Sequence, residues 1–216
     1  MCAVSDIEGG TAAERHKSMK NSNSTRLDVR RLALAAMLTA IVVVLQLLGS
    51  FIRFGPFSVS LVLIPIVIGA ALLGWKLGAW LGFVFAVAVL LSGDAAPFLT
   101  MHPFGTIVTV LVKSTAAGAM AGLVYQLLHE LRPILRTLVA AIVCPVINTV
   151  LFLLGCRIFL WDIVSKWAAE AHFENVSIYA IVGLVGLNFV FELAFNCVLS
   201  PVIVRLVQMG KKESIE

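Results

Sequence analysis

Charged residues are almost absent from the interior of this sequence. They cluster at the two ends and in two short segments, 130–136 and 157–174, so that only five lie elsewhere: Arg53, Lys76, Asp94, Lys113 and Glu192. Charged residues make up 13% of the 216 residues and hydrophobic residues 60%, whereas about a quarter of an ordinary soluble domain is charged. This pattern excludes a soluble globular fold and predicts an integral membrane protein.

The charge-poor stretches are long enough for six transmembrane helices, because about 20 apolar residues cross the hydrocarbon core of a bilayer. We expect these helices at about 29–49, 58–73, 77–91, 104–128, 133–156 and 177–204. Segment 157–175 is too polar to cross and has the pattern of an amphipathic helix at the membrane surface. The predicted fold class is an all-α integral membrane protein, a compact bundle of six transmembrane helices formed by residues 29–207.

The positions of the Lys and Arg residues predict the orientation of the bundle. With six crossings and the amino terminus inside, most of the 16 Lys and Arg lie on the cytoplasmic side, as the positive-inside rule requires. Both termini of this multi-pass cell-membrane protein are therefore expected in the cytoplasm. The net charge of +4 predicts no nucleic-acid partner, because the basic residues stand at segment ends, where lipid headgroups explain them.

Neither the two tails, nor the cysteines, nor any short sequence motif indicates a catalytic activity. Residues 1–28 have no apolar core of the signal-peptide type, so we expect a disordered cytoplasmic tail there, and a short cytoplasmic tail at 208–216. The four cysteines form no CxxC pair, which argues against a metal site or a disulfide framework. Hydrolase, metalloprotease and phosphate-loop motifs are lacking. We therefore expect no enzyme, no metal and no cofactor.

Polar residues inside the predicted helices are the strongest sign of a binding site, since such residues are costly in a membrane. Lys113, Asn148 and Asn188 each lie roughly 12–17 Å below the outer end of their helix, at ~1.5 Å per residue. Three helices thus bring polar groups to one depth. The residues expected to bind a substrate are these three together with Glu192 one turn deeper, Thr109 on the same face as Lys113, and Gln46 near the outer end of the first helix.

Two interpretations of this polar cluster stay open. A pocket that opens outward would use it to bind a ligand, and the convergence of several helices favours this interpretation. Alternatively, Lys113 and Glu192 form a buried ion pair and the Asn side chains hold helices together. Gln46 either lines the pocket or caps a loop, and His102 is expected to be a solvated loop residue. A lid would come from the outer loops: Phe51, Arg53, Phe57, Asp94, Phe98, His102, Trp161, Trp167, His172 and Phe173.

Small residues form a separate face on the first helix, at Ala33, Ala36 and Ala40. Such a face lets another helix approach closely, so it serves either packing within the bundle or docking of an external partner. Glycines recur in the next two helices. They predict close packing of the second helix on the third, through Gly69, Gly74, Gly78 and Gly82.

Over residues 30–207 these features resemble the substrate-binding S components of energy-coupling factor (ECF) vitamin transporters. The resemblance rests on six helices in a short chain and on an Arg-Arg pair before the alanine-rich first helix. It also rests on the stretch IPIVIGAALLGWKLGAWLG at 64–82 and on four positions of the last helix, Asn188, Glu192, Asn196 and Pro201.

The resemblance implies a function and a set of partners. An S component binds a vitamin or vitamin precursor from outside and docks on a membrane-embedded T component that carries two cytoplasmic ATPases. ATP hydrolysis in that module would tilt the S component and deliver the ligand inside. The family's Ala-x-x-x-Ala docking face maps onto Ala36 and Ala40, with Ala33 beside them, and its ligand contacts come from the outer loops and helices four to six.

The ligand stays open between two vitamins at this point. Lys113 could neutralise a carboxylate, as on pantothenate, whereas the Asn and Glu side chains could bond hydroxyls or a ring edge, as on riboflavin. A lipid or another small solute is a further option. The main rival function is a stand-alone secondary transporter or channel that uses Glu192 as a proton or ion relay; another is a non-transporting membrane scaffold.

Overall fold

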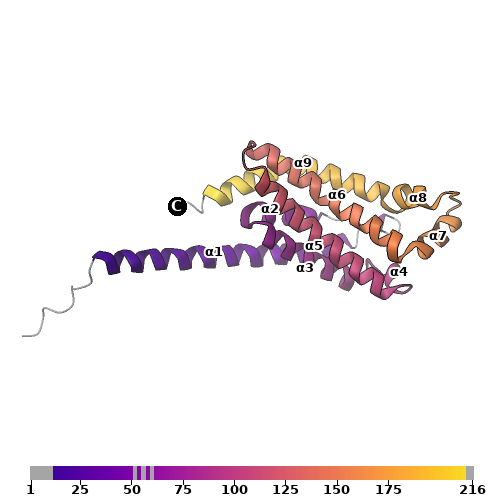
Figure 1. Cartoon of the computed structure of the whole chain (residues 1–216), viewed down its shortest axis with the longest axis horizontal. Coiled ribbons are helices and arrows are strands. Elements are labelled where there is room, and N and C mark those ends of the chain that lie inside the picture. The colour runs from indigo at the N-terminus through magenta and orange to yellow at the C-terminus, as the bar shows by residue number, and fades with distance from the viewer. Residues whose placement is uncertain (1–11, 51–52, 55–56, 59–60, 213–216) are drawn as a thin grey trace, which may run out of the picture.

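The computed structural model describes residues 12–50, 53–54, 57–58 and 61–212, and this part of the chain is almost entirely helical (Figure 1). Two short strands pair in an antiparallel manner, with Arg53 opposite Ser58. The all-helical fold expected from the sequence is confirmed for this part. In chain order the elements are α1 (Ala12–Gly49), β1 (Arg53–Phe54), β2 (Phe57–Ser58), α2 (Leu63–Leu73), α3 (Trp75–Ser92), α4 (Ala96–Leu99), α5 (Pro103–Leu127), α6 (Pro133–Phe159), α7 (Trp161–Glu170), α8 (Val176–Ile178), the π-helix η1 (Tyr179–Gly186) and α9 (Leu187–Lys212).

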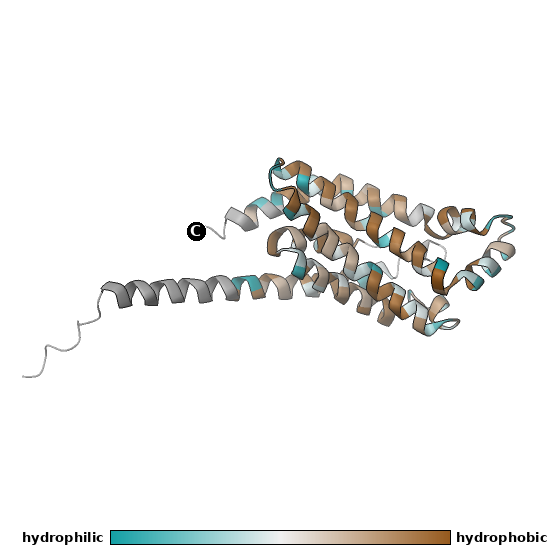
Figure 2. Ribbon diagram, in the orientation of Figure 1, coloured by the Kyte–Doolittle hydropathy of each residue, from teal (hydrophilic) through white to brown (hydrophobic). Residues whose placement is uncertain are grey.

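Four helices in the described part are long and apolar enough to cross a membrane: Val29–Gly49 within α1, α3, α5 and α6. The predicted first, third, fourth and fifth helices end within three residues of these bounds. Hydrophobic residues line the helices, and hydrophilic residues gather at the turns between them (Figure 2). The chain is therefore a multi-pass membrane protein.

The second predicted helix, at 58–73, is shorter than expected. Helix α2 has 11 residues, which is about 16 Å at 1.5 Å per residue, too short to cross ~30 Å of hydrocarbon. Pro65 stands in its first turn, where a missing backbone N–H needs no partner. The residues before it that the structure describes include β2 rather than a further helical turn.

The last predicted helix, at 177–204, is broken rather than continuous. It consists of α8, η1 and α9, and its two halves, Val176–Gly186 and Phe189–Arg205, are bent by 40°. Two glycines, Gly183 and Gly186, lie in the π-helical segment, and glycine is a poor former of regular α-helix. Counted as one span, the bent pair brings the total in the described residues to five.

The segments expected outside the membrane differ in part from the prediction. The amphipathic helix expected within 157–175 is α7, which buries one face through Ile163, Val164 and Ala168. The expected disordered tail at 1–28 is helical from Ala12 onward, because α1 begins there. This part includes good helix formers such as Ala, Glu, Lys and Met. Residues 1–11 lie outside the described residues. Of the expected carboxy-terminal tail, 208–212 continue α9 and 213–216 also lie outside them.

Helices α3 and α5 pack backbone against backbone. A Cβ atom added at Gly78 would clash with the carbonyl oxygen of Gly118, and one added at Gly82 would clash with that of Ser114. Of the predicted glycine contacts, Gly69 packs against α3 as expected, through Leu81. Gly78 and Gly82, however, pack chiefly against α5. Both residues have no side chain, so the two backbones come close enough to fix the crossing of these helices.

Helices α1 and α3 run in the same direction. Near their carboxyl ends, Gln46 of α1 donates a hydrogen bond to Asp94, just beyond α3, and earlier along both helices Trp80 donates to Thr39. Since α1 ends and α3 begins at opposite ends of the bundle, the described residues between them include α2 on the way back along it. Helix α2 therefore covers only part of that return.

Candidate functional site

One cavity lies near the end of the bundle where α1 and α3 finish and α5 begins. Its volume is about 100 Å³. Helices α1, α3, α4, α5, α6 and α9 and the π-helix η1 all contribute to its wall. The lining residues are Gln46, Phe85, Val89, Asp94, Ala95, Phe98, Thr106, Thr109, Val110, Lys113, Asn148, Thr149, Phe152, Leu160, Leu184, Val185 and Glu192.

The structure brings five of the six predicted site residues together around this cavity: Gln46, Thr109, Lys113, Asn148 and Glu192. Lys113 and Asn148, which the sequence places at one depth, thus line the same cavity, and their role in binding stays a prediction. The side chain of the sixth, Asn188, lies outside the described residues. Asn196, the next member of the same helical stripe, is buried, and its amide nitrogen donates a 2.8 Å hydrogen bond to the Glu192 carbonyl oxygen.

Two opposite charges face the cavity from different helices. Glu192 of α9 is buried, and Lys113 of α5 lines the same cavity. The Lys113 ammonium also lies 4.9 Å from the centre of the Phe152 ring, a distance at which the ring attracts a cation. Lys113 thus brings a cationic group, held against an aromatic ring, to the wall of the cavity.

Two polar atoms in the wall of the cavity lack a hydrogen-bond partner among the described residues. They are the hydroxyl oxygen of Thr109 and the amide oxygen of Asn148, and both are buried. A buried polar atom without a partner costs about 1–3 kcal/mol. Because both atoms belong to residues that line the cavity, a molecule held there can supply the missing bonds.

Gln46 both lines the cavity and fixes a loop, so the two roles that the sequence left open are combined. Its amide nitrogen donates to the Asp94 carboxylate at 2.6 Å, and the Ser50 hydroxyl donates to the same oxygen at 2.8 Å. These bonds tie the carboxyl end of α1 to the loop after α3. The rim of the cavity at this end of the bundle is thereby attached to α1.

Aromatic side chains cover the cavity on the α7 side. Phe98 of α4 makes edge contacts with Phe152, at 5.8 Å between ring centres, and with Trp167 of α7, at 5.0 Å. Phe98 and Trp167 were expected in a lid. Phe152 was not singled out from the sequence, although it stands one turn after Asn148 on the same helical face and that spacing could have identified it.

Asp94, also expected in the lid, lines the cavity, whereas the other predicted lid residues lie elsewhere or outside the described part. The guanidinium of Arg157 stacks on Trp161, and Phe173 packs on Tyr179. His102 is exposed, as expected of a solvated loop histidine, and it also caps α5 by accepting a hydrogen bond from the Gly105 N–H. His172 has a backbone φ of 58°. Phe51 and the side chains of Arg53 and Phe57 lie outside the described residues.

The small-residue face of α1 points away from the bundle. Ala33, Ala36 and Ala40 are all exposed, whereas Leu38, Val42 and Gln46 are buried on the opposite side of the helix. In Figure 1, α1 runs along the flank of the bundle and extends beyond it. The interpretation of the alanines as internal packing is therefore wrong within the described structure.

Comparisons with known proteins agree with this architecture. Residues 30–204 match the family described as "ECF transporter, substrate-specific component". The chain is 26% identical over 200 residues to a protein of Lactococcus lactis subsp. cremoris (strain MG1363) named "Pantothenic acid transporter PanT"; the match covers 84% of this chain and 95% of the relative. No solved structure matches the chain. The family match spans most of the sequence, and the chain belongs to the substrate-specific components of ECF transporters.

Proposed function

We propose that this chain is the substrate-capture subunit of an ATP-driven importer and that its ligand is pantothenate. The observation that carries the proposal is the position of Lys113 in a cavity that also presents two unpaired polar atoms, on Thr109 and Asn148. A carboxylate on Lys113 would form a charge-assisted hydrogen bond, which is about twice as strong as a neutral one.

The remaining groups of pantothenate suit the rest of the wall. Its hydroxyl and amide N–H groups can donate hydrogen bonds to the Asn148 oxygen and to the Glu192 carboxylate. Its amide carbonyl can accept a hydrogen bond from the Thr109 hydroxyl. Riboflavin has no carboxylate and a wide three-ring system, so it makes less use of Lys113. The name of the relative, which refers to pantothenic acid, supports the same choice.

The outer face of the α1 helix supports docking on a T component that works with two cytoplasmic ATPases. Ala33, Ala36 and Ala40 form a shallow exposed surface where another helix can pack closely. Gln46, on the opposite side of the same helix, lines the cavity. ATP hydrolysis by the partners would then tilt the loaded subunit and release the ligand inside.

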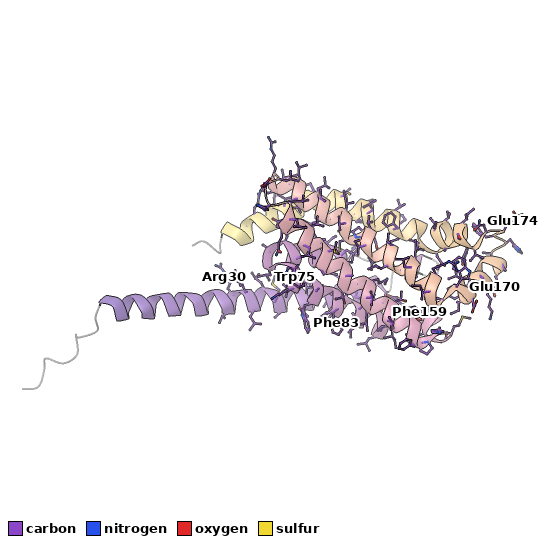
Figure 3. The ribbon with its side chains drawn as sticks, in the orientation of Figure 1. Arg30, Trp75, Phe83, Phe159, Glu170 and Glu174 are labelled. Atoms are coloured by element: carbon purple, nitrogen blue, oxygen red, sulfur yellow. The ribbon has the colours of Figure 1, made fainter. Side chains whose placement is uncertain are left out.

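The orientation that fits this function places the cavity toward the outside and both termini in the cytoplasm, with six crossings. The return of residues 50–74 along the bundle supports a sixth crossing, made by α2 together with the residues before it. Trp75 and Glu170 lie at opposite ends of the bundle (Figure 3). The Trp75 end also carries Lys76, Arg132 and Arg136, as expected for a cytoplasmic side.

The test is to identify the ligand that the purified protein retains. The protein is isolated in mild detergent and denatured, and the released molecules are identified by mass spectrometry; direct binding of pantothenate and of riboflavin is then measured. Stoichiometric pantothenate and tight pantothenate binding are expected. Retention of riboflavin alone would overturn the choice of pantothenate as the ligand. Uptake by the chain without any T component or ATPase would favour the stand-alone transporter with Glu192 as a proton or ion relay.

A further inference from the structure

A second hollow lies at the opposite end of the bundle from the substrate cavity. Its volume is about 350 Å³. It is formed where α2 meets α3, and where α5 turns into α6. Its lining residues are Ala71, Leu72, Leu73, Gly74, Tyr125, Gln126, His129 and Arg136. Neither the family match nor the proposed capture of a vitamin gives this hollow a role.

Arg136 is the residue in this hollow that points to a ligand. Its guanidinium carbon lies over the Tyr125 ring, 4.8 Å from the ring centre, a distance at which the ring attracts a cation. Its Nε atom is buried and has no hydrogen-bond partner among the described residues. Nε and a neighbouring amino group of arginine together form the edge that binds two oxygens of a phosphate or carboxylate.

The other lining residues suit an anion. Gln126 and His129 are exposed and offer further hydrogen-bond donors. The amide nitrogen of Gln126 occupies the space over Gly74, which a Cβ atom would otherwise fill. None of the residues that line the hollow in the described structure is acidic. An anion at Arg136 would therefore meet donors and no opposing carboxylate.

The surroundings favour a lipid as the source of the anion. Arg136 lies in the first turn of α6, about 5 Å along the helix from Pro133, a depth that suits lipid headgroups when α6 begins at the membrane surface. Large apolar side chains near the hollow are exposed, as lipid-facing residues are: Trp75, Leu127, Ile134 and Leu135. Basic pockets between transmembrane helices on the cytoplasmic side are known to hold lipid phosphates.

We propose that this hollow is a phosphate-binding site, with Arg136 as its main ligand, and that the phosphate is the headgroup of an anionic phospholipid of the inner leaflet. Free inorganic phosphate shares the same chemistry, so the test separates the two sources. The bound headgroup would hold the α2–α3 and α5–α6 turns together at the end of the molecule away from the vitamin.

The test compares phosphatidylglycerol, phosphatidylcholine and inorganic phosphate on the full chain in neutral detergent. Retained lipid is counted by native mass spectrometry, and thermal stability is followed during titration. The wild-type protein is expected to retain phosphatidylglycerol in preference to phosphatidylcholine. Arg136→Gln is expected to weaken this binding at least tenfold, whereas Arg132→Gln, a change at an exposed arginine that does not line the hollow, should leave it unchanged.

The proposal is overturned if Arg136→Gln retains phosphatidylglycerol as the wild type does, or if the wild type shows no preference for it. Protection by inorganic phosphate alone, lost in Arg136→Gln, would keep the phosphate site and overturn the lipid source. Arg136→Lys keeps the positive charge but cannot donate two parallel hydrogen bonds to one phosphate. It replaces Arg136→Gln in the test if that variant does not fold, and it too should bind phosphatidylglycerol more weakly than the wild type. Vitamin binding by each variant verifies that the bundle is intact.

Discussion

At the residue scale, the cavity proposed to bind the substrate is marked by a few polar groups whose depth could be calculated from the sequence. Lys113 and Asn148 lie at the same depth because they are about equally far from one end of their antiparallel helices, and Glu192 lies one turn deeper. The apolar part of the wall could not be predicted in the same way. Phe85 and Leu184 resemble every other apolar residue in a chain that is 60% hydrophobic, and only packing decides which of them face a cavity.

Lys113→Met is expected to weaken pantothenate binding by about 10- to 100-fold, because a hydrogen bond to a charged group contributes about 1.5–3 kcal/mol. Methionine keeps most of the side-chain length and the contact with Phe152. Isothermal titration of the purified variant measures the change. Lys76→Met, at the exposed start of α3, is the matched control and should bind normally. An unchanged dissociation constant in a folded Lys113→Met protein would assign this lysine to structure.

Thr109→Val should separate binding from stability. The Thr109 hydroxyl has no partner among the described residues, so its removal should leave the empty protein equally stable or more stable. Pantothenate affinity should fall by about 2- to 10-fold as one hydrogen bond is lost. Thr106→Val is the comparison, because the Thr106 hydroxyl donates to the His102 carbonyl and its loss should lower thermal stability. Reduced stability with unchanged affinity for Thr109→Val would contradict the ligand role.

At the element scale, the long uniform helices were predictable and the irregular ones were not. The spans of α1, α3, α5 and α6 follow from runs of apolar residues between polar turns. Helix α2 is short and the last span is broken, although both segments are as apolar as the regular helices; there the geometry depends on packing against neighbours. The side of α1 that carries the alanines could not be assigned from spacing, since an internal and an external small-residue face have the same pattern.

Ala36→Trp should block uptake while ligand binding stays normal, because a large side chain on the exposed alanine face would keep a partner helix away. Radiolabelled pantothenate uptake in cells that contain the complete transporter is compared with binding by the purified variant. Val198→Trp, at an exposed position of α9, is the control for a bulky residue at the membrane-facing surface. Normal uptake by Ala36→Trp would exclude this face as the docking surface.

Gly82→Ala should destabilise the bundle, since the added Cβ would collide with the Ser114 carbonyl oxygen in the α3–α5 crossing. Overpacking of this kind typically costs about 1–3 kcal/mol, seen as a lower melting temperature in detergent. Phe83→Ala, at the adjacent exposed position, should change the melting temperature little. Equal melting temperatures for Gly82→Ala and the wild type would show that α3 and α5 can move apart at this crossing without a loss of stability.

At the scale of the whole molecule, the two proposed sites at opposite ends of the bundle require one orientation in the membrane. Single cysteines introduced by Glu170→Cys and Lys76→Cys, both at exposed positions, are treated with a membrane-impermeant maleimide on intact cells. Glu170→Cys should react and Lys76→Cys should react only after the cells are opened. The unchanged chain gives the background from its native cysteines. The reverse pattern would place the vitamin cavity on the cytoplasmic side.

The parallel course of α1 and α3 constrains how the newly made chain enters the bilayer. Helix α2 has 11 residues, too few to span the bilayer without the residues before it, so its position is expected to depend on packing against its neighbours. Helix α3 must nevertheless arrive in the same direction as α1. Helices α1, α2 and α3 are therefore expected to reach their final positions together, after α5 has been synthesised and has packed its glycines against α3.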